Sequence, residues 1–191
     1  FNILELDQEI VIRHSTSITI QALLLAQMLH LDNKMAFPPD KLSVLFPSFI
    51  MHDMGKFGVD KHIVTKQGRL TDEEFTAMKP HPQYGCYLLK LLDRDRILPF
   101  SKSVMGVILT HHARYDGHGY PLKLKGRDIP ILARFLNILD SIDAMRRREH
   151  RQGQSSSAQT SLRFALKELE QKAWMQVDPY LIDLIYGAFA E

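Results

Sequence analysis

Two features of the sequence predict an all-α fold. Apolar residues recur at helical spacing along almost the whole chain, and no clear run alternates apolar and polar residues as a half-buried strand does. The chain has 191 residues, of which 45% are hydrophobic and 24% charged, so it can bury a sizeable core without disulfides. We therefore expect one helical domain spanning residues 1–191.

Two apolar stripes predict the first helices. One stripe lies near the N-terminus and consists of Val11, Ile18, Ala22, Leu25 and Leu29. The other leads into His52 and Asp53 and consists of Leu42, Leu45, Phe46 and Phe49. Pro47 lies inside this second segment and should kink the helix or restart it, because proline has no backbone N–H to donate.

Caps and prolines mark the later boundaries. The run Thr71-Asp72-Glu73-Glu74 is a capping box, so a helix should begin there and continue to about residue 79, where Pro80 and Pro82 force a break. Further helices are expected over residues 101–112, 128–147, 158–173 and 178–190.

The last helices have clear local signals. Asp178 and Pro179 supply a cap and a first turn for the C-terminal helix. Three segments lack periodicity and should be irregular: 55–70, 115–127 and 151–157. The segment 151–157 is polar and should be a mobile loop. The helix over 128–147 presents an inner face of Ile129, Leu132, Ala133, Leu136 and Ala144.

Composition excludes several classes of function. The formal net charge of +2 is too small to indicate bulk nucleic-acid or membrane binding. The single cysteine, Cys86, excludes an internal disulfide and fits a reducing compartment. No apolar run reaches membrane-spanning length and no signal peptide opens the chain, so we expect a cytoplasmic protein. Because the chain starts at Phe1, we also expect a longer protein with an upstream regulatory domain.

The placement of histidines and aspartates is the most informative feature. His14 lies in step with the first apolar stripe, and His81 lies between two prolines. Adjacent pairs end two predicted helices, namely His52-Asp53 and His111-His112. Asp140 and Asp143 lie on the inner face of the 128–147 helix, where a buried carboxylate is costly unless it is paired or binds metal. Such a mixed N/O set suits iron, manganese, nickel or zinc, and one carboxylate can bridge two ions.

Each of these residues also has an ordinary structural interpretation. His14 could be a hydrogen-bonded core histidine, His81 a helix cap, and Asp140 the partner of Arg134 on the same helix. Neighbours on a helix point about 100° apart, so His111-His112 alone is a weak signal. These interpretations would need several independent coincidences, and a metal centre is therefore favoured. The remaining histidines are expected at the surface or in a loop: His30, His62, His118 and His150.

The same residues resemble a known family. The HDxGK motif of HD-superfamily phosphohydrolases resembles the run His52-Asp53-Met54-Gly55-Lys56. The HHxRxDGxGYP motif of the HD-GYP subgroup resembles His111-His112 with Arg114 and Asp116-Gly117-His118-Gly119-Tyr120-Pro121. The HPxxG, DxxDA and FDP elements of that subgroup resemble His81-Pro82 with Gly85, the run Leu139-Asp140-Ser141-Ile142-Asp143-Ala144, and Val177-Asp178-Pro179. The matches occur in family order and cover nearly the whole chain.

The resemblance implies a helical bundle of about seven helices with an inserted loop. This loop contains Gly119, Tyr120 and Pro121 and is called the GYP loop below. The resemblance also implies a metal-dependent phosphodiesterase that hydrolyses cyclic di-GMP, or a related cyclic dinucleotide, to pGpG or GMP with a metal-bridging hydroxide. By position, Asp53 would be the bridging carboxylate, and the metal ligands would be His14, His52, Asp53, His81, His111, His112 and Asp140. Asp53 and Lys56 would be catalytic, and substrate would be bound by Lys56, Arg114, Gly119, Tyr120, Pro121 and Arg147. In this family the GYP loop is also linked to diguanylate cyclase domains.

The chain departs from the family pattern at three places, one of which is Pro47, because the family usually has an uninterrupted helix before the His-Asp pair. Members with three metals resemble one another in a glutamate four residues before the first histidine, and here that position is Ile10. We therefore predict two divalent ions, iron being expected and manganese, nickel or zinc being alternatives. The third departure is the segment 145–151, which keeps the basic charge of an RPYR-like run, including Arg147, without its Pro-Tyr spacing.

Several roles stay open at this point. Arg114 could contact phosphate or pair with Asp116, and Tyr120 could stack on guanine or pack the loop. Asp143, one turn after Asp140, is interpreted as a residue that orients a histidine. Two alternative functions are a metal-binding signalling module that docks cyclases with little or no turnover, and a di-iron oxygenase.

Overall fold

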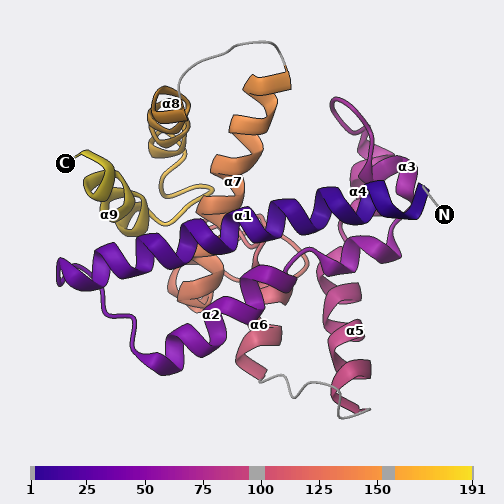
Figure 1. Ribbon diagram of the computed structural model, residues 1–191, viewed down its shortest axis with the longest axis horizontal. Helices are drawn as coiled ribbons and strands as arrows, with labels where there is room; N and C mark the ends of the chain where they lie inside the picture. The colour runs from indigo at the N-terminus through magenta and orange to yellow at the C-terminus, as the bar shows by residue number, and fades with distance from the viewer. Residues whose placement is uncertain (1–2, 95–101, 152–157, 191) are drawn as a thin grey trace.

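The described part of the chain is almost entirely helical (Figure 1). The computed structural model describes residues 3–94, 102–151 and 158–190, and these contain no β-strand. Seven helices in this part have nine residues or more, which confirms the predicted bundle. The elements are α1 (Ile3–Leu31), α2 (Pro39–Met51), η1 (Met54–Gly58), α3 (Lys61–Val64), α4 (Asp72–Met78), α5 (His81–Arg94), α6 (Lys102–Thr110), η2 (Gly126–Asp128), α7 (Ile131–Arg151), α8 (Ala158–Glu170) and α9 (Pro179–Ala190).

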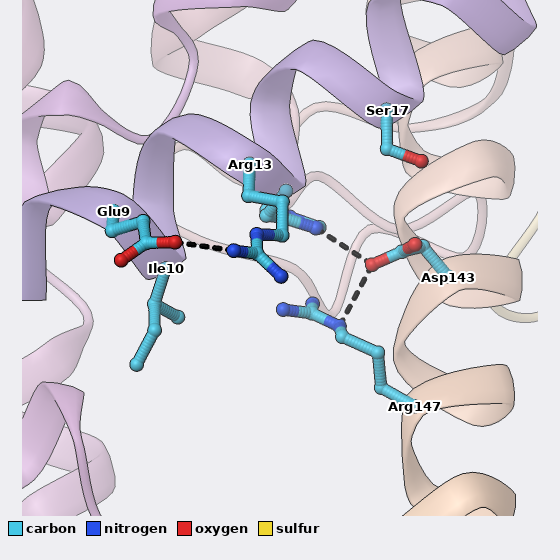
Figure 2. Close-up of a pocket in the computed structure, with 7 residues that line it drawn as sticks. Glu9, Ile10, Arg13, Ser17, Asp143 and Arg147 are labelled. Atoms are coloured by element: carbon cyan, nitrogen blue, oxygen red, sulfur yellow. Dashed lines mark hydrogen bonds and ion pairs between the residues drawn. The ribbon is translucent and has the colours of Figure 1, made fainter. Parts of the chain in front are cut away.

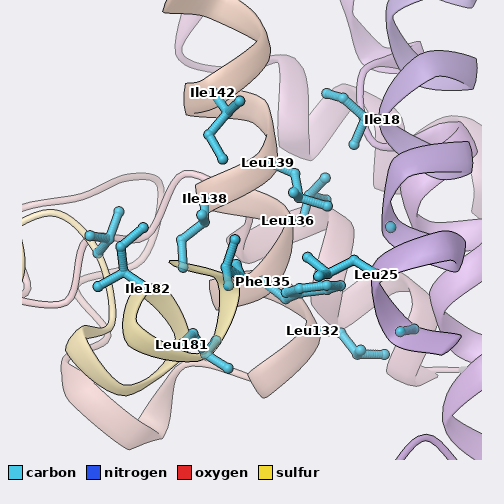
Figure 3. Close-up of a cluster of buried hydrophobic side chains, with 14 of the residues drawn as sticks. Ile18, Leu25, Leu132, Phe135, Leu136, Ile138, Leu139, Ile142, Leu181 and Ile182 are labelled. Carbon is cyan, nitrogen blue, oxygen red and sulfur yellow. The ribbon is translucent and has the colours of Figure 1, made fainter. Parts of the chain in front are cut away.

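The core lies where α1, α7 and α9 meet. In Figure 1, α1 runs along the long axis of the molecule and α7 crosses it steeply. Figure 3 shows Leu25 of α1 and Leu136 of α7 in one buried cluster with Leu181 and Ile182 of α9. Full burial of each such side chain stabilises the fold by about 1.5–3 kcal/mol. The predicted inner faces of α1 and α7 are buried, except that Ala144 is only half-buried.

Helix α2 runs through Pro47 without interruption, so the prediction of a restart there is wrong. The carbonyl left without a helical donor belongs to Ser43, which is exposed, so water can donate to it. Two residues predicted on the inner face, Leu42 and Phe46, are exposed. The helix packs against α1 and α6 and buries a narrower face than its apolar pattern indicates, made of Leu45, Ser48 and Phe49.

The prolines around His81 separate α4 from α5, but α5 begins at His81 itself. Pro82 is its second residue. A backbone N–H in the first turn has no acceptor within the helix, so proline can occupy this position without the loss of a helical hydrogen bond. The 14 residues of α5 were not predicted from the apolar pattern. The capping box of α4 is present: the Thr71 hydroxyl accepts from the Glu74 N–H at 3.2 Å, and the Glu74 carboxylate accepts from the Thr71 N–H at 2.7 Å.

Most other boundaries agree with the sequence prediction. The segment 55–70 contains the short helices η1 and α3, and the stretch from 115 to the start of η2 is irregular. Asp178 caps α9, since its Oδ1 accepts from the Tyr180 N–H at 2.9 Å. Residues 101 and 152–157, which include most of the predicted mobile loop, lie outside the described residues. Among the described helices, none combines the length and apolar character needed to cross a membrane.

Gly55 allows η1 to lie directly against the start of α5. A Cβ at this position would lie 1.8 Å from the carbonyl oxygen of His81 and 2.4 Å from the backbone nitrogen of Gly85. Both atoms belong to the backbone, so neither can move aside as a flexible side chain would. The missing side chain thus sets the distance between the segment that carries Asp53 and the one that carries His81.

Replacing Gly55 by alanine should lower the free energy of unfolding by about 1–3 kcal/mol or more, because the backbones must separate. Thermal unfolding followed by circular dichroism measures this change. The control is Gly106→Ala in α6, where an added Cβ meets nothing within 4 Å. That variant should keep its stability or gain up to about 1 kcal/mol. Equal melting temperatures for Gly55→Ala and the unmodified chain would contradict the steric argument.

Candidate metal centre

Seven histidine and aspartate side chains converge from distant parts of the chain. They come from α1, α5, α7 and the residues that follow α2 and α6. Their nitrogen and oxygen atoms form two groups, within each of which the atoms lie no more than 4.8 Å from one another. One group contains Asp53, His81, His111 and His112, and the other contains His14, His52 and Asp140. These are the seven residues that the sequence predicts as ligands.

Three of the histidines are oriented by the ends of helices. His52, His81 and His111 each follow the last turn of a helix, where backbone carbonyls have no partner within the helix. The Nδ1 atom of each ring donates to the carbonyl three residues earlier, which fixes the tautomer and leaves the lone pair on Nε2. The acceptors are Phe49 at 2.7 Å, Met78 at 2.9 Å and Ile108 at 2.6 Å.

The free lone pairs point toward one another rather than toward donors. The Nε2 atoms of His81 and His111 lie 3.3 Å apart, and with both protons on Nδ1 they cannot form a hydrogen bond. The Nε2 atom of His52 is buried and has no hydrogen-bond partner, and the Nε2 atom of His14 faces only carboxylate oxygens. Buried acceptors without donors are costly, and a cation between them removes that cost. The residues present therefore fit a metal ion.

Asp53 connects the two groups. Its Oδ1 lies 3.4 Å from Nε2 of His81 and 3.9 Å from Nε2 of His111. Its Oδ2 lies 3.4 Å from Nε2 of both His14 and His52. The side chain is only 2% exposed, so water contributes little to its stabilisation. A carboxylate with one oxygen toward each imidazole group has the arrangement of a bridging ligand.

Burial sets the protonation states of the imidazoles. It lowers the pKa of His81 to about 4 and that of His112 to about 3, because the imidazolium is poorly solvated there. Burial also holds the pKa of His111 well below its usual value. These three rings are therefore neutral near pH 7, and neutral imidazole is the form that binds metal.

The carboxylates are kept anionic. Burial opposes the ionisation of Asp53, but Lys56, His52 and His81 outweigh it, so the pKa of Asp53 lies well below its usual range. Burial likewise opposes the ionisation of Asp140, and the hydrogen bond from His14 outweighs it and lowers the pKa of Asp140. The site thus combines anionic carboxylates with neutral rings.

His14 differs from the other histidines because it lies inside a long helix. Its Nδ1 lies 2.7 Å from Oδ2 of Asp143, and its Nε2 lies 3.1 Å from Oδ1 of Asp140 and 3.4 Å from Asp53. Burial lowers the pKa of His14, but the hydrogen bonds to Asp140 and Asp143 outweigh burial and raise it. Three carboxylates around one ring call for positive charge at Nε2, carried by a proton or by a metal ion.

Two alternatives raised by the sequence are resolved by ion pairs. Arg134 contacts Asp178, not Asp140, so Asp140 does not have the arginine partner that was considered for it. Arg114 pairs with Asp116 through two contacts, at 2.7 and 3.2 Å. The structure therefore supports the interpretation of Arg114 as part of an ion pair within the GYP loop.

The GYP loop lies against the cluster of histidines and aspartates. The Tyr120 ring stacks on His112 with centroids 4.8 Å apart and an interplanar angle of 27°. A Cβ at Gly119 would lie 2.3 Å from the backbone nitrogen of Arg114, so only glycine allows this approach. The Tyr120–Pro121 peptide bond is cis. Tyr120 thus has the packing role that the sequence left as one of two possibilities.

Two other cations lie beside the cluster. Lys56 contacts Oδ2 of Asp53, and its side chain is 23% exposed, so its ammonium group reaches both the centre and the solvent. Arg147 forms an ion pair with Asp143, the residue that contacts His14 (Figure 2). Of the other histidines, His30, His62 and His118 are exposed as predicted, and the side chain of His150 lies outside the described residues.

Asn137 is a supporting residue that the sequence analysis missed. Its amide nitrogen donates to the carbonyl oxygen of His111 at 3.0 Å, and the residue is 9% exposed. It lies one turn before Asp140 on the inner face of α7. Asn137 is a polar residue on the same apolar helix face as Asp140 and Asp143. This pattern in the sequence could have identified it as a residue that supports the site.

Comparisons with known proteins agree with this geometry. The family model for the HD domain matches residues 1–181. A cyclic di-GMP phosphodiesterase of Vibrio cholerae is 39% identical over 111 residues, which are 56% of this chain and 22% of that protein. A cyclic di-GMP phosphodiesterase of Thermotoga maritima is 43% identical over 95 residues, which are 50% of this chain and 25% of that protein. The chain thus spans about a quarter of the length of these relatives.

The fold also has a close counterpart among solved structures. An HDG"Y"P protein from Bdellovibrio bacteriovorus superimposes with a TM-score of 0.69 at 19% sequence identity, covering 95% of this chain and 53% of that one. The family match, the helical fold and the converging histidines and aspartates lead to one conclusion. The chain belongs to the HD-domain family, within which its motifs identify it as an HD-GYP domain.

Proposed function

We propose that this chain is the catalytic domain of a metal-dependent phosphodiesterase that hydrolyses cyclic di-GMP, or a related cyclic dinucleotide, to pGpG or GMP. The observation that carries the proposal is the position of Asp53, whose two oxygens face two separate imidazole groups. The names of the relatives from Vibrio cholerae and Thermotoga maritima support the choice of substrate class.

In the proposed centre, His81, His111 and His112 would help to hold one divalent ion, His14, His52 and Asp140 would help to hold a second, and Asp53 would contribute to both. When bound, such ions would lower the pKa of water toward neutrality and would offset negative charge on phosphoryl oxygens. The donor set is mixed imidazole and carboxylate, so we propose iron, with manganese, nickel or zinc as alternatives. Ile10 cannot supply a ligand, which supports two ions rather than three.

The residues of the chain would act on the substrate side by charge and position. Lys56, partly exposed beside Asp53, would attract a phosphate to the centre. Tyr120, stacked on His112, would form one wall together with Gly119 and Pro121. We retain Arg114 and Arg147 as proposed contributors of positive charge near the substrate. Diguanylate cyclase domains and an upstream regulatory domain are proposed as partners.

The first prediction concerns metal content. Chain purified anaerobically, or loaded with Mn²⁺, should contain about two ions per molecule. Asp53→Asn should reduce this to about one ion or fewer, because both ions would lose the carboxylate they share. Elemental analysis and Mn²⁺ titration measure the change. His62→Ala, which removes an exposed histidine of α3, should retain the full content. A full complement of metal in Asp53→Asn would contradict the bridging role.

The second prediction concerns turnover. The chain loaded with Mn²⁺ or Fe²⁺ should convert cyclic di-GMP to pGpG or GMP, as followed by chromatography of the products. Lys56→Met should reduce kcat/KM by about 100-fold or more, since a fixed positive charge at the reacting phosphate is lost. Lys61→Met, at an exposed position of α3, is the matched control and should behave like the unmodified chain.

The same assay separates the proposal from the signalling-module alternative. Metal binding without turnover of cyclic di-GMP or of 3′,3′-cyclic GMP-AMP, under either metal, would argue against the phosphodiesterase. If binding to a diguanylate cyclase domain persisted in that case, the module would be favoured.

A further inference from the structure

A pocket of about 480 Å³ opens beside His14, between α1 and α7 (Figure 2). Two carboxylates line it, and each pairs with an arginine four residues later on its own helix. On α1 the pair is Glu9 with Arg13, and both side chains are largely exposed, at 57% and 78%. On α7 the pair is Asp143 with Arg147, and the Asp143 side chain is only 12% exposed. The two pairs share their chemistry but differ in burial and in their neighbours.

Only the pair on α7 reaches the metal centre. Oδ2 of Asp143 lies 2.7 Å from Nδ1 of His14 and 2.8 Å from Nε of Arg147, so one oxygen serves both groups. Asp140, one turn earlier on α7, faces the opposite ring nitrogen of His14 at 3.1 Å. Helix α7 therefore contacts both nitrogens of the same imidazole.

The position of His14 explains why this support must come from another helix. His52, His81 and His111 follow helix ends and donate Nδ1–H to free backbone carbonyls. His14 lies within α1, where the carbonyls of the preceding turn already accept helical hydrogen bonds. Its Nδ1 needs a side-chain acceptor, and a carboxylate in that place also brings a buried negative charge. The guanidinium of Arg147 offsets that charge.

Resting on the proposed function, we infer that Asp143 and Arg147 are a positioning pair for His14. Arg147 holds the Asp143 carboxylate, Asp143 accepts the Nδ1 proton of His14, and the Nε2 lone pair of His14 is thereby directed to the metal shared with His52 and Asp140. Arg147 acts through Asp143 and does not itself bind the metal. The pair also keeps Asp143 from turning toward the metal, since its inward oxygen is held on both sides.

The test compares Mn²⁺ affinity by calorimetry in the full chain. Arg147→Ala and Asp143→Asn should weaken binding by about 10–100-fold, as is typical when the partner of a metal-binding histidine is removed. Arg13→Ala, the matched change on the other wall of the pocket, should bind like the unmodified chain. Arg147→Lys should recover part of the affinity, and millimolar guanidinium should improve Arg147→Ala but not Asp143→Asn. The Arg147 side chain is 42% exposed, so the variant should fold, which circular dichroism can verify.

A second readout follows the ring directly. In the Zn²⁺-loaded, ¹⁵N-histidine-labelled chain, the Nδ1–H signal of His14 should be protected from exchange, and Asp143→Asn should weaken that protection. Unchanged Mn²⁺ affinity in both Arg147→Ala and Asp143→Asn would overturn the inference, whatever the hydrolysis result. If the variants show the expected order of Mn²⁺ affinities but the unmodified chain hydrolyses no cyclic dinucleotide, only the proposed function would be contradicted. A chain that binds no Mn²⁺ would overturn both.

Discussion

The buried carboxylate of Asp53 is the constraint on which the rest of the site depends. A charge that is 2% exposed needs compensation from a cation, and here Lys56 contacts the carboxylate while four histidine rings surround it. These groups come from α1, α5 and the ends of α2 and α6, so the helices must meet around one point. Gly55 makes this meeting possible because it lets η1 touch the backbone of α5.

Helix ends and helix interiors supply histidines in different ways. At an end, a free carbonyl orients the ring at no extra cost, as at His52, His81 and His111. In an interior the acceptor must come from elsewhere, and α7 provides it for His14 through Asp143. The same helix buries Phe135 and Leu136 in the core, so α7 contributes both to core packing and to the geometry of the site.

The loop after α6 is held by contacts rather than by regular structure. Backbone hydrogen bonds join Tyr115 and Asp116 to the segment before α9, and Tyr120 lies against His112. A loop fixed in this way can form a wall of the site without strands or helices of its own. Gly119 is required because its backbone lies directly against the backbone of Arg114, where a side chain would not fit. The glycine therefore meets a packing requirement and not a need for flexibility.

The sequence by itself determined the helical class and the capping box at Thr71, because these depend on local periodicity and on residue type. The seven histidines and aspartates that converge were predicted from their resemblance to the family motifs. Only the tertiary structure decided which oxygen of Asp53 faces which ring, and that Arg147 contacts Asp143. It also decided that Leu42 and Phe46 are exposed and that α5 starts at His81. These outcomes depend on which distant segment packs against a given face. The pattern of neighbouring residues along the chain carries no information about which distant segments come into contact.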